Sequence, residues 1–280
     1  MPFLGFLLWL VGTVVGLSFL LMLIVVFVWV WPRKTVKPSD ALVCDYAHRG
    51  LHGRGVPENS LAAFELACQA GYGIELDVQL SRDGEVMVFH DYTLSRMTGK
   101  EGKLCELTAA ELGALALGES EQTIPTFTQV LALVNGRVPL LIELKGETAD
   151  ASLCPKVAAL LEDYRGEYCL ESFNPILIGQ MKKLLPRAYR GLLYTNVCRE
   201  KKKNSLLNIA LTAMALNLVA KPDFIAYNQE YRNALPVRLC TSGYRVPRFV
   251  WTVKSAADRD AAHALGEKTI FEGIFENESD

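Results

Sequence analysis

The chain begins with one long apolar run and continues as short apolar segments separated by amphipathic ones. From Pro2 to Trp31 no residue is charged, and nearly all are Leu, Val, Phe, Ile or Trp. A membrane-spanning helix needs about 20 such residues, so this run can cross a bilayer with some tilt. Trp9, Trp29 and Trp31 lie towards its two ends, where membrane helices carry aromatic belts. We predict one N-terminal transmembrane helix.

A cleaved signal peptide is the alternative interpretation of this run. Signal peptides have a basic n-region and an apolar core of about 7–15 residues that ends in small residues. Here no basic side chain precedes the run, which is longer and ends in the bulky pair Trp31-Pro32. The transmembrane interpretation therefore fits better.

Three cations, Arg33, Lys34 and Lys37, follow the run directly. The positive-inside bias places the flank that carries such residues in the cytoplasm. We expect a single-pass protein of the cell membrane with a cytoplasmic catalytic domain. Residues 1–40 would form the anchor and linker, and residues 41–280 the domain.

Beyond the linker, short apolar strands alternate with helical patterns, which is typical of a parallel α/β fold. Leu61, Phe64 and Cys68 share one helix face before Gly71, and a second helical face follows from Phe127. The domain is close to the length of about 250 residues that is usual for a (β/α)8 barrel. We predict this TIM-barrel fold, with strands near 45–48, 73–78, 140–144, 168–172, 191–194, 224–227, 249–253 and 273–275.

The second strand carries a hairpin signal. Asp83-Gly84 separates it from the alternating segment 86–89, and Asp-Gly between two such runs is typical of a tight turn. Folding the chain back at this turn puts His90 opposite Asp77, to within about one residue. His90 should therefore return to the edge of the barrel where the second strand ends.

Charge and cysteine content exclude some classes of function. The net charge is −2 and no basic stripe is present, which argues against a nucleic-acid partner. The seven cysteines contain no CxxC pair, and several lie in apolar runs, so we expect buried free thiols in a reducing compartment. The short run 201–203 of three lysines is interpreted as a solvated loop, with contact to anionic lipid heads as the alternative.

Three carboxylates end apolar strands. Glu75 and Asp77 are two residues apart, so both side chains point to one face of their strand, and Glu143 has the same placement on another strand. Active sites of TIM barrels lie at the C-terminal ends of the strands. Buried carboxylates side by side are costly unless a cation joins them, and oxygen ligands suit Mg²⁺ or Ca²⁺. The alternative is that one or more of them faces solvent.

Two cations lie next to these groups. Lys145 shares a face with Glu143, and Arg49 directly follows His48. A Glu-x-Lys pair is commonly a structural ion pair, and here the lysine could equally offer its charge to a phosphate oxygen. Arg49 is open to the same two interpretations, since arginine binds phosphate through paired N–H donors.

The chain has four histidines, and two of them end apolar strands at the expected catalytic edge. These two, His48 and His90, are the candidate acid–base groups. His263 lies in a helical segment and is expected on the surface, whereas His52 lies in a glycine-rich loop and is ambiguous. Trp251 ends a later strand, where it could serve as plain core or as the wall of a substrate pocket.

Seven short motifs occur in an order that resembles the glycerophosphodiester phosphodiesterase family. They extend from residue 46 to 251 and read Ala-His-Arg-Gly, Pro-Glu-Asn-Ser, Glu-Leu-Asp-Val, Phe-His-Asp, Ile-Glu-Leu-Lys, Ser-Phe-Asn and Trp-Thr-Val. The resemblance implies a (β/α)8 barrel that cleaves glycerophosphodiesters to an alcohol and glycerol 3-phosphate with a divalent metal. By motif position it implies three sets of residues: acid–base groups His48 and His90, metal ligands Glu75, Asp77 and Glu143, and phosphate contacts Arg49 and Lys145.

The chain departs from this family pattern in two places. The segment 270–277 replaces the Gly-Ile-Ile-Thr-Asp-like strand that many members have, and 196–220 is a long, rather apolar connection that could be a lid, a membrane-facing helix or simple core. A long apolar pocket near Trp251 and residues 206–218 would favour a lysophospholipase D-type activity on single-chain lipids such as lysophospholipids. A non-catalytic, membrane-tethered binding module is the alternative from another class.

Overall fold

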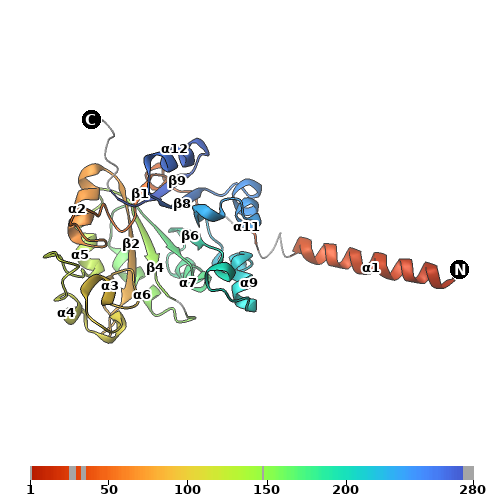
Figure 1. Ribbon diagram of the computed structural model, residues 1–280, viewed down its shortest axis with the longest axis horizontal. Coiled ribbons are helices and arrows are strands. Elements are labelled where there is room, and N and C mark those ends of the chain that lie inside the picture. Colours follow the sequence, from red (N-terminus) through yellow and green to blue (C-terminus); the bar gives the residue numbers. More distant parts are fainter. Residues whose placement is uncertain (1, 25–29, 33–35, 147, 274–280) are drawn as a thin grey trace.

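The structure is a computed structural model that describes residues 2–24, 30–32, 36–146 and 148–273. Eight parallel strands close into a barrel, with helices around it (Figure 1). β1 closes the ring, because Tyr46 pairs with Gly73 on one side and with Ile270 on the other. In ring order the strands are β1 (Tyr46–Ala47), β2 (Gly73–Leu80), β4 (Leu140–Leu144), β5 (Tyr168–Ser172), β6 (Tyr189–Tyr194), β7 (Phe224–Asn228), β8 (Arg248–Val253) and β9 (Lys268–Phe271).

The predicted TIM barrel is confirmed, and seven of its strands lie where the apolar runs place them. The last strand is a correction: it is Lys268–Phe271 rather than 273–275, of which residues 274 and 275 lie outside the described part. The β-branched and aromatic residues Thr269 to Phe271 follow closely on Gly266, whose φ of +72° ends the preceding helix. The strand therefore starts as soon as the chain has turned.

The hairpin after β2 is present. β3 (Val86–Val88) pairs antiparallel with β2, with Val88 opposite Val78, and the Phe89 amide donates to the Asp77 carbonyl. Asp77 therefore faces Phe89, and His90 lies within one residue of it, as the turn signal predicts. Gly84 takes the positive φ of +80° that this turn requires.

Helices cover the outside of the barrel where the sequence is amphipathic. The first, α2 (Leu61–Ala70), starts at Ser60, whose hydroxyl accepts from the Ala63 amide, and ends at Gly71 with φ +74°. The other barrel helices are α5 (Phe127–Val134), α6 (Leu153–Glu162), α7 (Pro175–Leu184), α9 (Leu206–Thr212) and α12 (Ala256–Ala264). Shorter segments are η2 (Asp40–Leu42), α3 (Ser95–Thr98), η3 (Leu104–Glu106), α4 (Ala109–Leu112), α8 (Val197–Glu200), α10 (Asn217–Ala220), η4 (Gln229–Tyr231), α11 (Leu235–Arg238) and η5 (Leu239–Gly243).

Apolar side chains fill the barrel interior at its N-terminal end. This inner core includes Tyr46, Leu141, Tyr189, Phe224 and Phe249. Because side chains alternate along a strand, the next inward positions of β2 and β4 lie nearer the opposite end. Those positions carry carboxylates, so polar groups gather at the C-terminal mouth.

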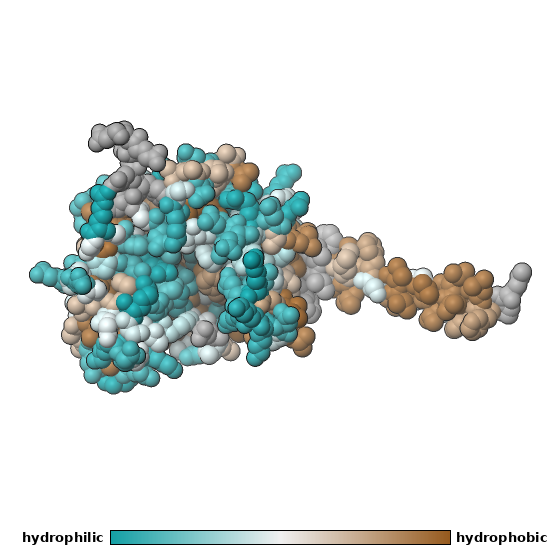
Figure 2. All heavy atoms as spheres, in the orientation of Figure 1, coloured by the Kyte–Doolittle hydropathy of each residue, from teal (hydrophilic) through white to brown (hydrophobic). Residues whose placement is uncertain are grey.

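The N-terminal helix α1 (Pro2–Ile24) stands apart from the barrel. Its window Phe3–Ile24 has a mean hydropathy of 2.5 and is not covered by any other described part (Figure 2). At 1.5 Å per residue, 22 residues span about 33 Å, close to the roughly 30 Å of a bilayer core. One hydroxyl in the helix is satisfied internally, since Thr13 donates to the Trp9 carbonyl. The helix is a candidate membrane span, and a signal sequence passes the same test.

The chain reaches the barrel through a short segment around Trp31. Val30 is buried, and its carbonyl accepts from the Asn217 side-chain amide at 2.6 Å. Trp31 stacks on Tyr244 with ring centroids 5.6 Å apart. Residues 30 and 31 thus already contact the barrel domain, although the predicted boundary between anchor and domain is at residue 40. Trp29, Arg33 and Lys34 lie outside the described residues.

Candidate active site

Three buried carboxylates meet at the C-terminal mouth of the barrel. Parallel pairing of β2 and β4 puts Asp77 beside Glu143, and Glu75 lies one inward position earlier on β2. One oxygen of each carboxylate lies within 4.8 Å of the others. The sequence predicted this convergence from strand ends alone, and the structure brings all three together.

The protein interior opposes three negative charges at this spacing. Burial, followed by the charges of Asp77 and Glu143, raises the pKa of Glu75 well above its ordinary value. Burial also raises the pKa of Glu143 to about 7. For Asp77 burial raises the pKa, but the charges of Lys145 and its other cationic neighbours outweigh this and hold it low. The cluster is therefore a site where added positive charge is favoured.

Lys145 supplies part of that charge. Its ammonium lies 3.0 Å from a Glu143 oxygen and 3.3 Å from an Asp77 oxygen. These two carboxylates raise the pKa of Lys145 despite its burial, so the side chain stays protonated. The lysine is thus an ion-pair partner of the cluster.

Glu171 is a fourth carboxylate that the sequence reasoning missed. It is opposite Glu143 in the pairing of β4 with β5, and it is buried. Its Oε2 has no hydrogen-bond partner among the described residues, and burial raises its pKa well above the ordinary value. An acidic residue in the apolar run Tyr-Cys-Leu-Glu-Ser was the available signal. The converging carboxylate oxygens of Glu75, Asp77 and Glu143 fit a hard divalent cation, and the unsatisfied Glu171 oxygen adds negative charge beside them.

Arg49 is bound into the site by its backbone as well as its side chain. With φ of +56°, its amide donates to Glu75 at 2.8 Å. Its guanidinium donates to Glu58 at 2.8 Å and lies 3.7 Å from Asp77. The same Asp77 oxygen accepts from the Asn59 side-chain amide at 2.8 Å. Glu58 and Asn59 belong to a motif that the sequence singled out without giving them a role.

The two candidate acid–base histidines enter from different loops. His48 follows β1, and its Nε2 is 4.0 Å from Glu75. Burial, then the neighbouring Arg49, lowers its pKa well below the ordinary value, so the imidazole is neutral at pH 7. His90 places Nδ1 2.6 Å from an Asp91 oxygen. A carboxylate can only accept, so Nδ1 carries the proton and Nε2 is left for chemistry.

Residues outside the predicted set hold His90 in place. The Gln79 side-chain amide contacts the carbonyls of Phe89, His90 and Asp91 at 2.8–3.1 Å. Arg96 then donates to Asp91 at 2.5 Å and to Glu58 at 2.6 Å, which links the His90 loop to Arg49. Nothing local in the sequence distinguishes this glutamine from any other in a strand.

The other two histidines pair with carboxylates outside the cluster. His263 is half-exposed and lies 2.8 Å from Asp45 on the outside of the domain. His52 lies 4.0 Å from Glu272, which follows β9 and also pairs with Lys254 at 2.7 Å. Glu272 therefore stands at the edge of the barrel where the family pattern differs.

A cavity of about 550 Å³ opens beside the cluster. Glu143 and Lys145 line it, together with apolar side chains such as Phe173, Leu207 and Leu211 and polar ones such as Thr195 and Glu200. Trp251 is not among the lining residues. It meets Phe173 edge-to-face, with centroids 5.5 Å apart, so it supports the wall that Phe173 forms.

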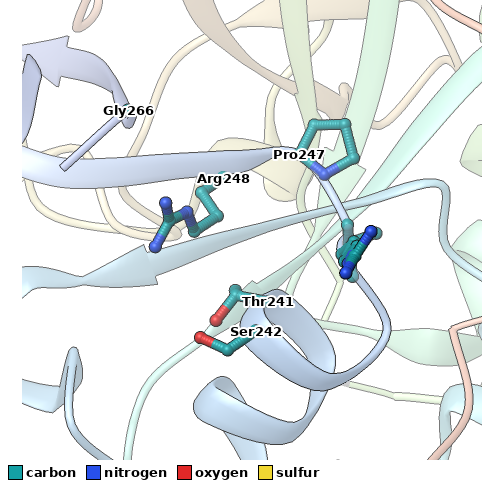
Figure 3. Close-up of a pocket in the computed structure, with 7 residues that line it drawn as sticks. Thr241, Ser242, Pro247, Arg248 and Gly266 are labelled. Carbon is teal, nitrogen blue, oxygen red and sulfur yellow. The ribbon is translucent and has the colours of Figure 1, made fainter.

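A second hollow lies at the opposite end of the barrel. It measures about 380 Å³ and is lined by residues that include Thr241, Ser242, Arg248 and Gly266 (Figure 3). Arg248 starts β8, so this hollow is at the N-terminal ends of the strands, away from the carboxylates. The Arg248 guanidinium donates to the Leu265 carbonyl at 2.5 Å. We assign this second hollow no part in the chemistry.

Glycerophosphodiester phosphodiesterases are among the known proteins that match this chain. Over 159 residues it is 36% identical to a glycerophosphodiester phosphodiesterase of Caldanaerobacter subterraneus, a match that covers 53% of this chain and 65% of that protein. A Bacillus subtilis glycerophosphodiester phosphodiesterase is 27% identical over 69% of this chain and 72% of its own length.

Solved structures show the same fold. An Oleispira antarctica phosphodiesterase, determined with its product sn-glycerol 3-phosphate, superposes with a TM-score of 0.67 at 24% identity, over 82% of this chain and 92% of that one. The model of the glycerophosphoryl diester phosphodiesterase family matches residues 48–280, which include every site residue described above. The chain belongs to the glycerophosphoryl diester phosphodiesterase family.

Proposed function

We propose that this protein is a membrane-anchored, metal-dependent glycerophosphodiester phosphodiesterase, which releases an alcohol and glycerol 3-phosphate. One observation carries the proposal: three buried carboxylates converge at the barrel mouth beside a lysine and two histidines. Glu75, Asp77 and Glu143 would hold Mg²⁺ or Ca²⁺. When bound, the cation supplies positive charge to the phosphate oxygens.

The side chains of the chain itself account for the remaining chemistry. Hydrolysis breaks the bond between phosphorus and the alcohol oxygen and adds the elements of water, so the attacking oxygen loses a proton and the leaving oxygen gains one. His48 lies against Arg49, which disfavours its charged form, and we assign it as the base. Burial lowers the pKa of His90, but the charge of Asp77 and the hydrogen bond to Asp91 oppose that shift, and we assign His90 as the acid.

Arg49 and Lys145 are proposed to hold the phosphate. Both face the cluster through ion pairs with Asp77. Charge-assisted bonds to phosphate oxygens are about twice as strong as neutral hydrogen bonds. These contacts recognise the phosphate group and do not depend on the alcohol attached to it.

The direct test is hydrolysis of glycerophosphocholine and glycerophosphoethanolamine by the full chain in detergent, with and without chelator. We expect glycerol 3-phosphate to form only when a divalent cation is present. Turnover that survives exhaustive chelation would contradict the metal assignment. No turnover of any phosphodiester with Mg²⁺ or Ca²⁺ would favour the non-catalytic binding module.

Lysophospholipids are a second candidate substrate class, favoured by the apolar cavity beside Lys145. Its walls extend from Phe173 to Leu207 and Leu211, so a single acyl chain could lie along them. Comparing kcat/KM for lysophosphatidylcholine and glycerophosphocholine separates the two classes. A higher value for the lysolipid would establish the lysophospholipase D-type activity as the main one.

Membrane anchoring through α1 is proposed on its length, its apolar composition and its full exposure. The cations from residue 33 to 37 favour a cytoplasmic domain. Fusing a reporter that is active only inside the cell, or one active only outside, to the C-terminus tests the orientation. Activity of the outside reporter alone would reverse the assignment.

A further inference from the structure

Helix α9 presents apolar side chains to the outside of the domain. Leu206 is 87% exposed, Leu207 61% and Ile209 47%. These three lie within the first four residues of the helix, where its N-terminal end meets solvent. Among the described residues of the barrel domain, Leu206 is the most exposed large apolar side chain. An apolar cluster of this kind marks a place where the surface meets another apolar phase.

A basic loop lies directly beside this patch. Lys201, Lys202 and Lys203 are all exposed. The loop is tied to the helix, because the Asn208 side chain donates to the Lys203 carbonyl at 2.7 Å. Ser205 caps the helix by accepting from the Asn208 amide. Cations next to exposed leucines are the combination that binds the surface of an anionic membrane.

The N-terminal segment joins the domain on the same side. The Val30 carbonyl accepts from Asn217, the first residue of α10, and from the Cys240 thiol. α10 follows α9 in the chain after four residues. Figure 1 places α9 and α11 at the side of the barrel from which α1 extends, and Figure 2 shows hydrophobic atoms on that side. Leu235 of α11 adds a side chain that is 69% exposed.

We propose that the α9 face, made of Lys201–Lys203, Leu206, Leu207 and Ile209, docks on a bilayer that contains anionic lipid. This inference rests on the proposed anchoring by α1, which brings the face to the membrane. A second copy of the chain is a poorer occupant, because a symmetric contact would bring the two lysine loops together. The bilayer satisfies both the leucines and the lysines.

Docking there connects the membrane with the catalytic cavity. Leu207 and Leu211 of α9 line the cavity that Glu143 and Lys145 also line. The helix that meets the lipid surface thus also forms a wall of the substrate cavity. A docked α9 would place the cavity beside the lipid phase from which a phosphodiester with an acyl chain is drawn.

Photo-crosslinking of the full chain in lipid nanodiscs tests the proposal. A benzophenone amino acid replaces Leu206 in one variant and Leu265, 48% exposed at the end of α12, in a matched control. The discs contain phosphatidylcholine alone or with phosphatidylglycerol. We expect lipid to attach at position 206 well above position 265, and more strongly on the anionic discs. Equal attachment at the two positions, or a protein–protein product at 206, overturns the proposal.

Charge and anchoring are separated by two further variants. Replacing the three lysines of the loop with Gln should reduce attachment at 206 on anionic discs to the level seen with phosphatidylcholine, since each lysine near such a surface contributes a factor of about five. Attachment that stays unchanged would contradict the electrostatic part. Benzophenone in place of Leu10 reports on α1 alone. Lipid crosslinked at position 206 but not at position 10 would refute the proposed anchor while still supporting the docking face.

Discussion

Replacing Glu143 with Gln should stabilise the metal-free protein while removing its response to metal. Burial raises the pKa of Glu143 from 4.5 to about 7. When folding raises the pKa of an acid, its charged form destabilises the folded state. The free energy of unfolding therefore falls as the pH rises above the pKa of the acid in the unfolded chain. At pH 7 a shift of this size costs about 3 kcal/mol. Glutamine has nearly the same shape and avoids that cost.

The expected changes in melting temperature follow from these free energies. For a domain of this size, 1 kcal/mol moves Tm by about 2–4 °C, so Glu143→Gln should raise the metal-free Tm by about 6–12 °C. In the parent protein, cation at about 100 times its Kd adds about 2.7 kcal/mol, which is about 5–11 °C. The variant lacks one of the proposed ligands, so most of this second shift should disappear.

Intrinsic-fluorescence melting of the full chain in detergent at pH 7 measures both shifts, with chelator or with Mg²⁺ or Ca²⁺. Glu65→Gln is the matched control, because that carboxylate pairs with Arg137 on the surface and should leave the metal response intact. At pH 5 Glu143 is already protonated in the folded parent protein, so the gain in metal-free Tm from Glu143→Gln should be smaller than at pH 7. A lower metal-free Tm in Glu143→Gln, or a full metal shift in that variant, would refute the reasoning.

The remaining predictions concern catalysis. His48→Ala and His90→Ala should each lower kcat by about 10²–10⁴-fold, with a mild effect of His52→Ala; equal damage from all three would mean that the pair is misassigned. A phosphodiester with a p-nitrophenol leaving group needs no acid, so it should restore most of the rate of the His90 variant only. Arg49→Ala should lower kcat/KM for all phosphodiesters together, whereas Trp251→Ala should reorder them by about 1–3 kcal/mol; the reverse outcome would exchange their roles.

The barrel could be predicted because its signals are local. Each strand is a short apolar run, and Asp83-Gly84 specifies a turn by its own chemistry. Once the strands are ordered around a ring, their C-terminal ends share one edge. Glu75, Asp77 and Glu143 then meet without any further information. The last strand was misplaced because two apolar pairs, at 270–271 and 274–275, offer the same local pattern.

The groups that the sequence did not reveal depend on partners far apart in the chain. Glu171 lies beside Glu143 because β5 pairs with β4 in one register, and a shift of one residue would turn it to the other face. Arg96 joins Asp91 to Glu58, 38 residues from Arg96 along the chain. Such contacts follow from closure of the barrel, and no periodicity encodes them.

The connection 196–220 shows why an apolar pattern alone does not settle a role. The sequence allowed a lid, a membrane-facing helix or simple core, and the three differ only in what lies on each side of the helix. In the structure Asn208 is buried while Leu206 is exposed, the inverse of what a core helix requires. Leu211 lines the cavity instead. A helix with apolar residues on an outer and an inner face borders two environments, and here the cavity beside Glu143 and Lys145 is the inner one.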